Sequence, residues 1–329
     1  MRSPSFCVVS RIFPPEGHDV IGDVHGCHDE LVALLRQMGY ARRRGAWRHP
    51  TRLAVFVGDL VDRGPQIGEV LETVAAMVGE GTAACLLGNH ERDVVFFHTL
   101  GPRGLPLRER SEQRIDQLAA THEQLGARSS RMKHWVRWMR MRPVLFEAPG
   151  LRVVHGAWNE SAAAYWRGKT LGATGMLDRL ADAESQDSVW LGQLLFGPVL
   201  TYKHEDRDGK RKTMRIRARW FSKPDELAGD TLWHAAFRRS PRVPRKRLTP
   251  AHRAALWGYP RDATPLITGH QSLPLDAVVR PMRANLACVD YSAVFGGRLC
   301  AYRWSGEKDL VPQHFVTVEA RPALPKPLP

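Results

Sequence analysis

The chain has 329 residues, 43% of them hydrophobic and 25% charged, which is the composition of a globular protein with a large core. No apolar run approaches the ~18 residues needed to span a bilayer, and the amino-terminal stretch is a poor signal peptide. We therefore expect a cytoplasmic protein with no membrane partner. The five cysteines include no CxxC pair, which argues against a disulfide framework or a cysteine-based zinc site.

The formal net charge of +14 has two interpretations. It indicates either an anionic partner such as nucleic acid, or positive charge spread over a solvated surface. The densest basic stretch, residues 238–247, contains prolines but no interleaved aromatic residues, which a groove that stacks bases would need. We favour the solvated surface and keep nucleic acid as an alternative partner.

The first third of the chain alternates apolar strands with amphipathic helices. The predicted strands are 18–22, 53–57 and 82–87, and the predicted helices are 28–38, 67–78 and 89–99. The continuous apolar run at 53–57 is typical of a strand that is buried on both faces. This alternation predicts a layered α/β domain.

The middle of the chain is predicted to be helical and then irregular. Helices are expected at 107–125 and 131–140, and an insertion is expected at roughly 157–262. Within it, strands at 201–205 and 213–220 flank an Asp-Gly turn and predict a hairpin. Alternation in the second strand places a row of arginines on one face, which we take as a solvated face.

Further strands are predicted at 151–154, at 266–268 and within 285–304. The sequence then divides into an amino-terminal extension at 1–17, one domain at 18–318 and a proline-rich, disordered tail at 319–329.

Five predicted strands run into a glycine beside a residue that commonly binds metals. These stretches are GDVHG at 22–26, GDLVDRG at 58–64, GNHE at 88–91, HG at 155–156 and GH at 269–270. The carboxyl ends of strands form the ligand-binding edge of layered α/β folds, so the five ends are expected to converge. Singly, each Asp or His is more often a helix cap or a satisfied polar residue. Together, Asp, Asn and His without a thiolate favour Mn²⁺, Fe or Zn.

These five stretches resemble the motifs of the calcineurin-like metallophosphoesterases. The Asp-Arg-Gly of GDLVDRG resembles the phosphoprotein phosphatase branch, which includes serine/threonine phosphatases and bacterial diadenosine tetraphosphatases. The resemblance covers most of the chain, from about 18 to 304, because RARWFSKPDEL and LACVDYSAVFGGRLCAYRW also resemble segments of bacterial members. It implies a four-layer αββα sandwich with helical and irregular insertions.

The resemblance also implies a centre of two divalent metal ions, with Mn²⁺ as the first expectation and Fe or Zn as alternatives. Asp23 and His25 would hold the first ion, and Asp59 would bridge both. The second ion would be completed by Asn89, His155 and His270.

Three further residues receive roles from the same resemblance. His90 would protonate the leaving oxygen, Asp62 would orient His90, and Arg63 would bind the phosphate. The chemistry agrees: two ions ~4 Å apart clamp a phosphate and lower the pKa of bound water, so metal-bound hydroxide attacks phosphorus directly. A guanidinium meets two phosphate oxygens, and a carboxylate-held histidine supplies a proton near neutral pH.

One departure concerns the substrate. Serine/threonine phosphatases usually carry Arg directly before GNHE, where this chain has Leu87. Arg92, or an arginine of the row at 215–219, is the candidate replacement.

The main prediction is a phosphatase for phosphate monoesters, on phosphoproteins or small molecules. The alternative is a dinucleoside-polyphosphate hydrolase. An alternative of another class is a basic nucleic-acid-binding protein with a vestigial metal site.

Overall fold

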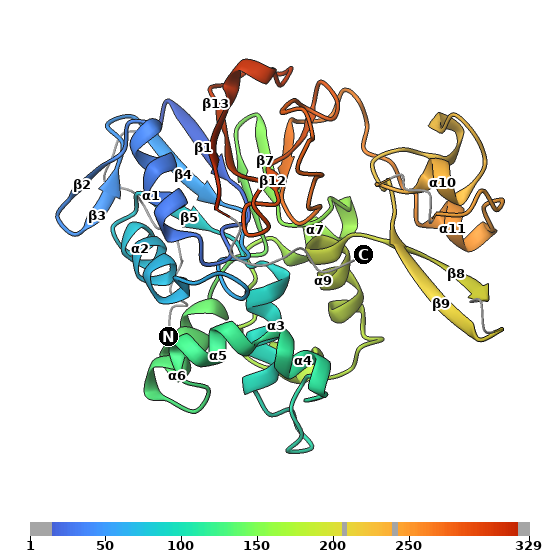
Figure 1. Cartoon of the computed structure of the whole chain (residues 1–329), viewed down its shortest axis with the longest axis horizontal. Helices are drawn as coiled ribbons and strands as arrows, with labels where there is room; N and C mark the ends of the chain where they lie inside the picture. The colour runs from blue at the N-terminus through green and yellow to red at the C-terminus, as the bar shows by residue number, and fades with distance from the viewer. Residues whose placement is uncertain (1–14, 206–208, 239–242, 322–329) are drawn as a thin grey trace.

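Two β-sheets pack face to face at the centre of the molecule (Figure 1). The computed structural model describes residues 15–205, 209–238 and 243–321. Val20 and Val55 of the first sheet share one buried apolar cluster with Val153 and Ile267 of the second. The predicted layered α/β architecture, with helices outside two central sheets, is confirmed.

The first sheet is mixed. Its order is β12 Asp290–Tyr291, β13 Arg298–Trp304, β1 Gly17–Ile21, β4 Arg52–Phe56 and β5 Ala83–Cys85, and β14 Phe315–Glu319 pairs with β13. Strands β1, β4 and β5 run parallel, so their carboxyl ends lie at one edge. Alternation along β4 points Val55 toward the second sheet and Ala54 and Phe56 toward the helices. The prediction of a strand buried on both faces is therefore confirmed.

The second sheet supplies two more parallel strand ends. Its order is β11 Leu286–Cys288, β10 Leu266–Thr268, β7 Leu151–Val154 and β6 Leu145–Ala148, with only β6 antiparallel among these strands. A small separate sheet pairs β2 Ala41–Arg43 with β3 Ala46–Arg48.

Helices α1 His28–Gln37 and α2 Ile67–Gly79 cover the outer face of the first sheet with apolar side chains. Helices α3 Asn89–His98 and α6 Ser130–Met139 also match the predicted ranges. The single helix predicted at 107–125 is wrong, because the segment forms α4 Glu112–Gln117 and α5 Ala119–Leu125. The residues of α4 are all exposed or half-buried, and the chain turns at Leu118 to bury that side chain.

The predicted insertion carries several short elements, of which the first three helices pack into the main core and the later ones surround a small apolar cluster of their own. They are α7 Glu160–Trp166, α8 Met176–Arg179, α9 Gln186–Phe196, β8 Val199–Glu205, β9 Arg211–Arg217, α10 Leu232–Ala235 and α11 Pro250–Ala254, with 3-10 turns at Pro224–Glu226 and, after the insertion, Pro312–His314. The hairpin is confirmed: β8 and β9 pair antiparallel, with Val199 opposite Arg217, and they project away from the two sheets (Figure 1).

Several predictions fall partly outside the described residues. They concern the extension at 1–17, the hairpin turn at 206–208, the basic stretch at 238–247 and the tail at 319–329. The division into one domain at 18–318 stays a prediction. Within the described ranges, every helix is too short or too polar to cross a membrane.

Candidate metal centre

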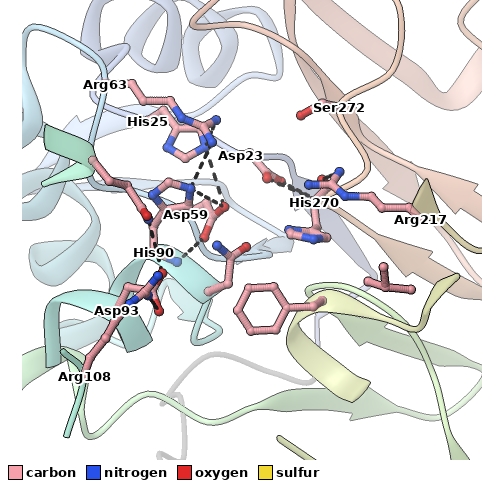
Figure 2. A pocket seen from close by; sticks show the side chains of 14 residues that line it. Asp23, His25, Asp59, Arg63, His90, Asp93, Arg108, Arg217, His270 and Ser272 are labelled. Carbon is pink, nitrogen blue, oxygen red and sulfur yellow. Dashed lines mark hydrogen bonds and ion pairs between the residues drawn. The ribbon is translucent and has the colours of Figure 1, made fainter. Parts of the chain in front are cut away.

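A cavity of about 240 Å³ lies where the strand ends converge (Figure 2). It is lined by side chains from the loops after β1, β4 and β10, from helix α3, and from segments beyond the two sheets. The lining residues are Asp23, His25, Asp59, Arg63, Asn89, His90, Asp93, Arg108, Gln117, Phe196, Val199, Arg217, His270 and Ser272. We call this space the central cavity. Seven of the sequence-predicted residues thus lie together at one place.

The loops that carry these residues are tightly folded. His25, Asp59 and His270 have φ angles of 43°, 52° and 64°, in the left-handed region that costs about 1–2 kcal/mol for a residue with a side chain. Gly64 is required by close approach, because a Cβ at that position would lie 1.9 Å from the backbone oxygen of His25. Such strain is typical of functional sites, where surrounding structure holds a side chain in one direction.

Two histidines present their Nε2 atoms to a shared carboxylate. Nδ1 of His25 lies 2.7 Å from the backbone oxygen of Val61, and Nδ1 of His155 lies 2.9 Å from that of Val57. Because a carbonyl only accepts, each Nδ1 carries a hydrogen, and in the neutral ring Nε2 keeps its lone pair. These Nε2 atoms lie 3.6 and 3.4 Å from carboxylate oxygens of Asp59. Metal-binding histidines are oriented in this way.

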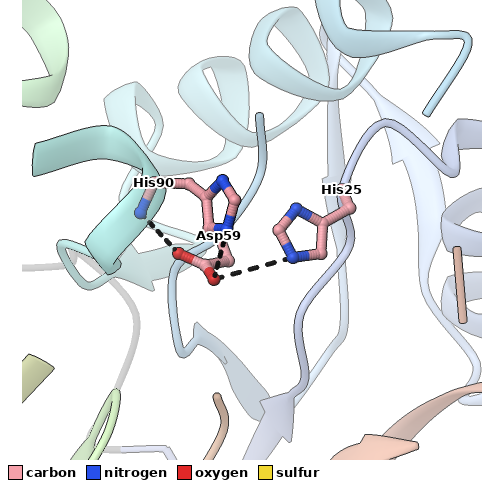
Figure 3. Close-up of side chains that lie close together, drawn as sticks. All are labelled: His25, Asp59 and His90. Carbon is pink, nitrogen blue, oxygen red and sulfur yellow. Dashed lines mark hydrogen bonds and ion pairs between the residues drawn. The ribbon is translucent and has the colours of Figure 1, made fainter. Parts of the chain in front are cut away.

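Asp59 belongs to two groups of ligand atoms, each within 4.8 Å. One group joins it to His25 and His90 (Figure 3), and the other joins it to His155 and His270. Asn89 adds an oxygen 3.0 Å from Nε2 of His155. A carboxylate common to two clusters is positioned to bridge two ions.

Asp23 lies beside His270 in the centre. Its two carboxylate oxygens accept the backbone N–H of His270 at 3.1 Å. Burial, and then the nearby charge of Asp290, raise the pKa of Asp23 well above its ordinary value. Burial also holds the pKa values of His25 and His270 well below the ordinary value, with Arg63 and Arg217 acting in the same direction.

The donor set fits divalent cations. Buried carboxylates and imidazoles converge on one space, and a positive ion there would accept the lone pairs that their oxygens and unprotonated ring nitrogens direct toward it. The absence of thiolate in this set favours Mn²⁺, Fe or Zn over a structural cysteine site.

His90 is held by a buried carboxylate. Its Nδ1 lies 2.6 Å from Oδ2 of Asp62, which is fully buried. The hydroxyl of Thr121 donates to the other oxygen of Asp62, and the backbone N–H of Asp62 donates back to that hydroxyl at 3.0 Å. Thr121, on α5, has no sequence signal of its own. The arrangement leaves Nε2 of His90 directed to the central cavity, and its role as acid rather than ligand stays a prediction.

Arg63 lies over the first ligand group. Its guanidinium lies 2.9 Å from Nε2 of His25 and 3.0 Å from Nε2 of His90, with the ring of Phe295 5.3 Å away. An anion that enters the cavity would meet this guanidinium.

Arg92 and Arg217, the two proposed replacements for the missing arginine, differ in position. Among the described residues, Arg92 is not part of the cavity lining, since its guanidinium binds Asp93 and lies 4.6 Å from the ring of Phe196. Arg217 lines the cavity and donates to the backbone oxygen of His270 at 2.5 Å. Of the two expected replacements, the arginine row at 215–219 is therefore better supported than Arg92, because its member Arg217 lines the cavity.

Glu91, the last residue of GNHE, has a supporting place that the sequence did not indicate. It is buried and accepts the backbone N–H groups of Gly88, Asp59 and Leu60 at 2.9, 2.8 and 2.7 Å. It thereby fixes the turn that carries Asp59. Burial, and then the charge of Asp59, raise the pKa of Glu91 to about 7.

Residues 19–168 match the family model described as calcineurin-like phosphoesterase. This region of the chain belongs to the calcineurin-like metallophosphoesterases. Metal-dependent hydrolysis of phosphate esters defines this class, and the buried His/Asp clusters of this phosphoesterase suit it.

Curated relatives of this phosphoesterase are named bis(5'-nucleosyl)-tetraphosphatases. It is 53% identical over 73 residues to an asymmetrical bis(5'-nucleosyl)-tetraphosphatase of Halalkalibacterium halodurans, covering 22% of this chain and 30% of that protein. It is 32% identical over 127 residues to a symmetrical bis(5'-nucleosyl)-tetraphosphatase of an Enterobacter species, covering 38% and 37%. The matches therefore span about a third of the relatives' lengths.

A solved protein serine/threonine phosphatase from Saccharomyces cerevisiae is similar in fold. It aligns with 94% of this chain and 81% of its own, with a TM-score of 0.51 and 14% identity. This likeness supports the fold alone.

Proposed function

We propose that this metallophosphoesterase hydrolyses dinucleoside polyphosphates, by direct attack of water on a phosphorus atom. The curated relatives named above are tetraphosphatases, and this supports the alternative of the sequence analysis over its main prediction of a monoester phosphatase. The observation that carries the proposal is the cavity lining, in which three arginines, Arg63, Arg108 and Arg217, accompany the metal ligands. A chain of phosphates carries enough negative charge to engage several guanidinium groups at once.

The ligands proposed for the first ion are Asp23, His25 and Asp59, and those for the second are Asp59, Asn89, His155 and His270. When bound, divalent ions supply a nucleophile from water near neutral pH and polarise the phosphoryl oxygens. We propose Mn²⁺ as the physiological ion, with Fe and Zn as alternatives. The cytoplasmic location stays a prediction.

Arg63 and Arg217 would hold the attacked phosphate from two sides. In the structure Arg63 donates toward the ring nitrogens of His25 and His90, while Arg217 lies beside His270. A bound phosphate would replace these ring nitrogens as the acceptor for Arg63, because two phosphate oxygens can each accept one N–H of the guanidinium. Nε2 of His90 then becomes free to carry a proton.

The bond changes balance as follows. The water oxygen releases one proton to solvent and forms a bond to phosphorus, while the bond from phosphorus to the leaving oxygen breaks and its electron pair stays on the leaving oxygen. His90 would protonate the leaving oxygen from Nε2, while Asp62 at 2.6 Å stabilises the imidazolium. The chain of steps requires no covalent phosphoenzyme.

Phosphate monoesters, on protein or small molecules, remain a second candidate. The observation that favours them is the His90–Asp62 pair, because an alkoxide leaving group needs a proton much more than a phosphate does. The nucleic-acid-binding alternative with a vestigial site has less support, since every proposed metal ligand is present and buried.

An assay of the purified protein tests the proposal. Diadenosine tetraphosphate, a phosphoserine peptide and an aryl phosphate are compared with Mn²⁺, Fe²⁺ or Zn²⁺ present. We expect the highest kcat/KM for diadenosine tetraphosphate and loss of turnover with a chelator. A higher kcat/KM for the phosphopeptide would overturn the substrate class, and metal-independent turnover would overturn the mechanism.

A further inference from the structure

One side of the central cavity contains side chains that have no role in the mechanism above. Asp93 follows His90 by three residues on α3, so the two side chains lie on the same face of that helix. Asp93 accepts Nε2 of Gln117 at 3.2 Å and forms an ion pair with Arg108. All three line the cavity, and we call them the Asp93 cluster.

The Asp93 cluster lies on the side of His90, away from Arg217. Figure 2 shows Asp93 and Arg108 beside His90, while Arg217 and Ser272 lie next to His270. A group that takes a proton from His90 must leave on the side where His90 lies. The leaving group therefore departs toward the Asp93 cluster.

We propose that Arg108, held by Asp93, is a specificity-determining residue that binds a phosphate of the leaving group. The proposal rests on the proposed function and assigns one part of the substrate to one part of the cavity. It makes the enzyme selective for leaving groups that themselves end in phosphate.

The charges around Asp93 support this assignment. The single Asp93 carboxylate, which is 3% exposed, pairs with the guanidinium groups of both Arg92 and Arg108. One negative charge cannot neutralise two positive ones, so Asp93 and its two arginine partners together keep a net positive charge. Arg92 is covered by the rings of Phe96 and Phe196, which leaves Arg108 as the one of these two arginines that reaches the cavity lining.

The chemistry of the leaving group explains the selectivity. When a phosphoanhydride is cleaved, the electron pair of the broken bond goes to a phosphate whose charge is spread over several oxygens. A guanidinium meets two such oxygens at once. An alcohol or phenol leaving group presents one oxygen, which His90 would protonate. It therefore offers no further oxygen for Arg108 to bind.

The test compares, as a ratio, how far a substitution lowers kcat/KM for two substrates, diadenosine tetraphosphate and an aryl phosphate. For Arg108→Gln we expect kcat/KM for diadenosine tetraphosphate to fall about 10–100-fold more than kcat/KM for an aryl phosphate, because one charge-assisted pair is lost. Arg108→Lys should recover part of that ratio. Arg217→Gln should lower both values by similar factors, since Arg217 would hold the attacked phosphate itself.

Arg114→Gln is the matched control. Arg114 lies on the neighbouring helix α4 and contacts Glu109, outside the cavity lining among the described residues. This variant should keep the wild-type ratio. An unchanged ratio in Arg108→Gln, or an equal ratio change in both variants, would overturn the proposal.

A binding measurement separates this proposal from the proposed function. Calorimetric titration with ADP, which resembles a departing nucleotide, should show about tenfold weaker binding to Arg108→Gln than to Arg114→Gln. If the wild type hydrolyses none of the esters, the proposed function fails while this titration still decides the Arg108 site. Equal ADP affinities for both variants would refute the site even in an active enzyme.

Discussion

Two buried polar clusters lie at opposite ends of strand β1, and they differ in how their hydrogen bonds are satisfied. At the amino-terminal end, Asp19 accepts Arg52 Nε at 2.8 Å, Arg303 Nε at 3.1 Å and the Tyr40 hydroxyl at 3.0 Å. At the carboxyl end, the carboxylate of Asp59 accepts the backbone N–H of His90 at 2.9 Å and faces Nε2 of His25 and of His155 at 3.6 and 3.4 Å.

The difference identifies which cluster has a functional role. A buried polar group whose charge is neutralised and whose hydrogen bonds are satisfied within the protein stabilises the fold. The second cluster gathers a carboxylate and several imidazole nitrogens around one cavity, with the Arg63 guanidinium beside them, and such a convergence of titratable groups in a cavity is typical of a ligand-binding site. Residue type alone does not separate the two clusters, since both contain a buried aspartate on or directly after a strand.

The largest expected effects come from substituting the two aspartates. Asp59→Asn should lower kcat by about a thousandfold, because several kcal/mol of metal-dependent stabilisation are lost, with little loss of folding stability. Asp19→Asn should lower the free energy of unfolding by about 3 kcal/mol, because Arg52 is left without its partner, and should change kcat only severalfold.

Turnover and urea unfolding are measured on both variants. If Asp59→Asn destabilised the fold as much as Asp19→Asn, the distinction between the two clusters would be lost.

The next effect concerns His90 within the carboxyl-end cluster. His90→Asn should slow hydrolysis of an alkyl phosphate about 10²–10⁴-fold, because the leaving alkoxide loses its proton donor. Cleavage to a phosphate leaving group, whose pKa is about 6, should slow much less. Steady-state kcat values for both substrates check this, with Arg114→Gln as control. Equal losses on the two substrates would indicate that His90 binds a metal ion instead.

The smallest effect concerns His18, at the amino-terminal end of β1. Burial, and then the charge of Arg52, lower the pKa of His18 to about 4. The folded protein keeps His18 neutral while the unfolded chain takes up a proton below pH ~6.5, so this stability is complete above pH 6.5 and is lost as pH falls toward 4. Between pH 6.5 and 5 the loss amounts to at most about 2 kcal/mol.

His18→Phe should flatten the pH dependence of stability between pH 6.5 and 5, because a phenyl ring keeps the packing against Trp304 and Phe146 without titrating. Urea unfolding at several pH values measures this, and exposed His204, substituted by Asn, is the control. Parallel curves for wild type and His18→Phe would contradict the expectation. Turnover at neutral pH should remain close to that of the wild type.

The amino-acid sequence alone could predict the α/β class and the residues that gather at the strand ends. It could do so because a glycine and a ligand directly after an apolar strand have local positions fixed by the strand, and parallel strands bring their carboxyl ends to one edge. Asp23, His25, Asp59 and Asn89 lie together for this reason, although their individual roles stay predictions.

Which other side chains reach the cavity depends on the tertiary structure. Arg92 is adjacent to GNHE in sequence, yet its helical position turns it to Asp93 and Phe196. Arg108 comes from a loop, where no local pattern sets its direction, and Arg217 ends β9 in the predicted insertion, where alternation gives its face of the strand but not what that face meets. Their places depend on packing between segments far apart in the chain: the turn at Leu118 that separates α4 from α5, and the pairing of β8 with β9. Long-range packing of this kind leaves no periodic signal in the sequence, so the candidate ligands and Arg63 could be predicted from strand ends, Arg217 only as one member of the row at 215–219, and Arg108 not at all.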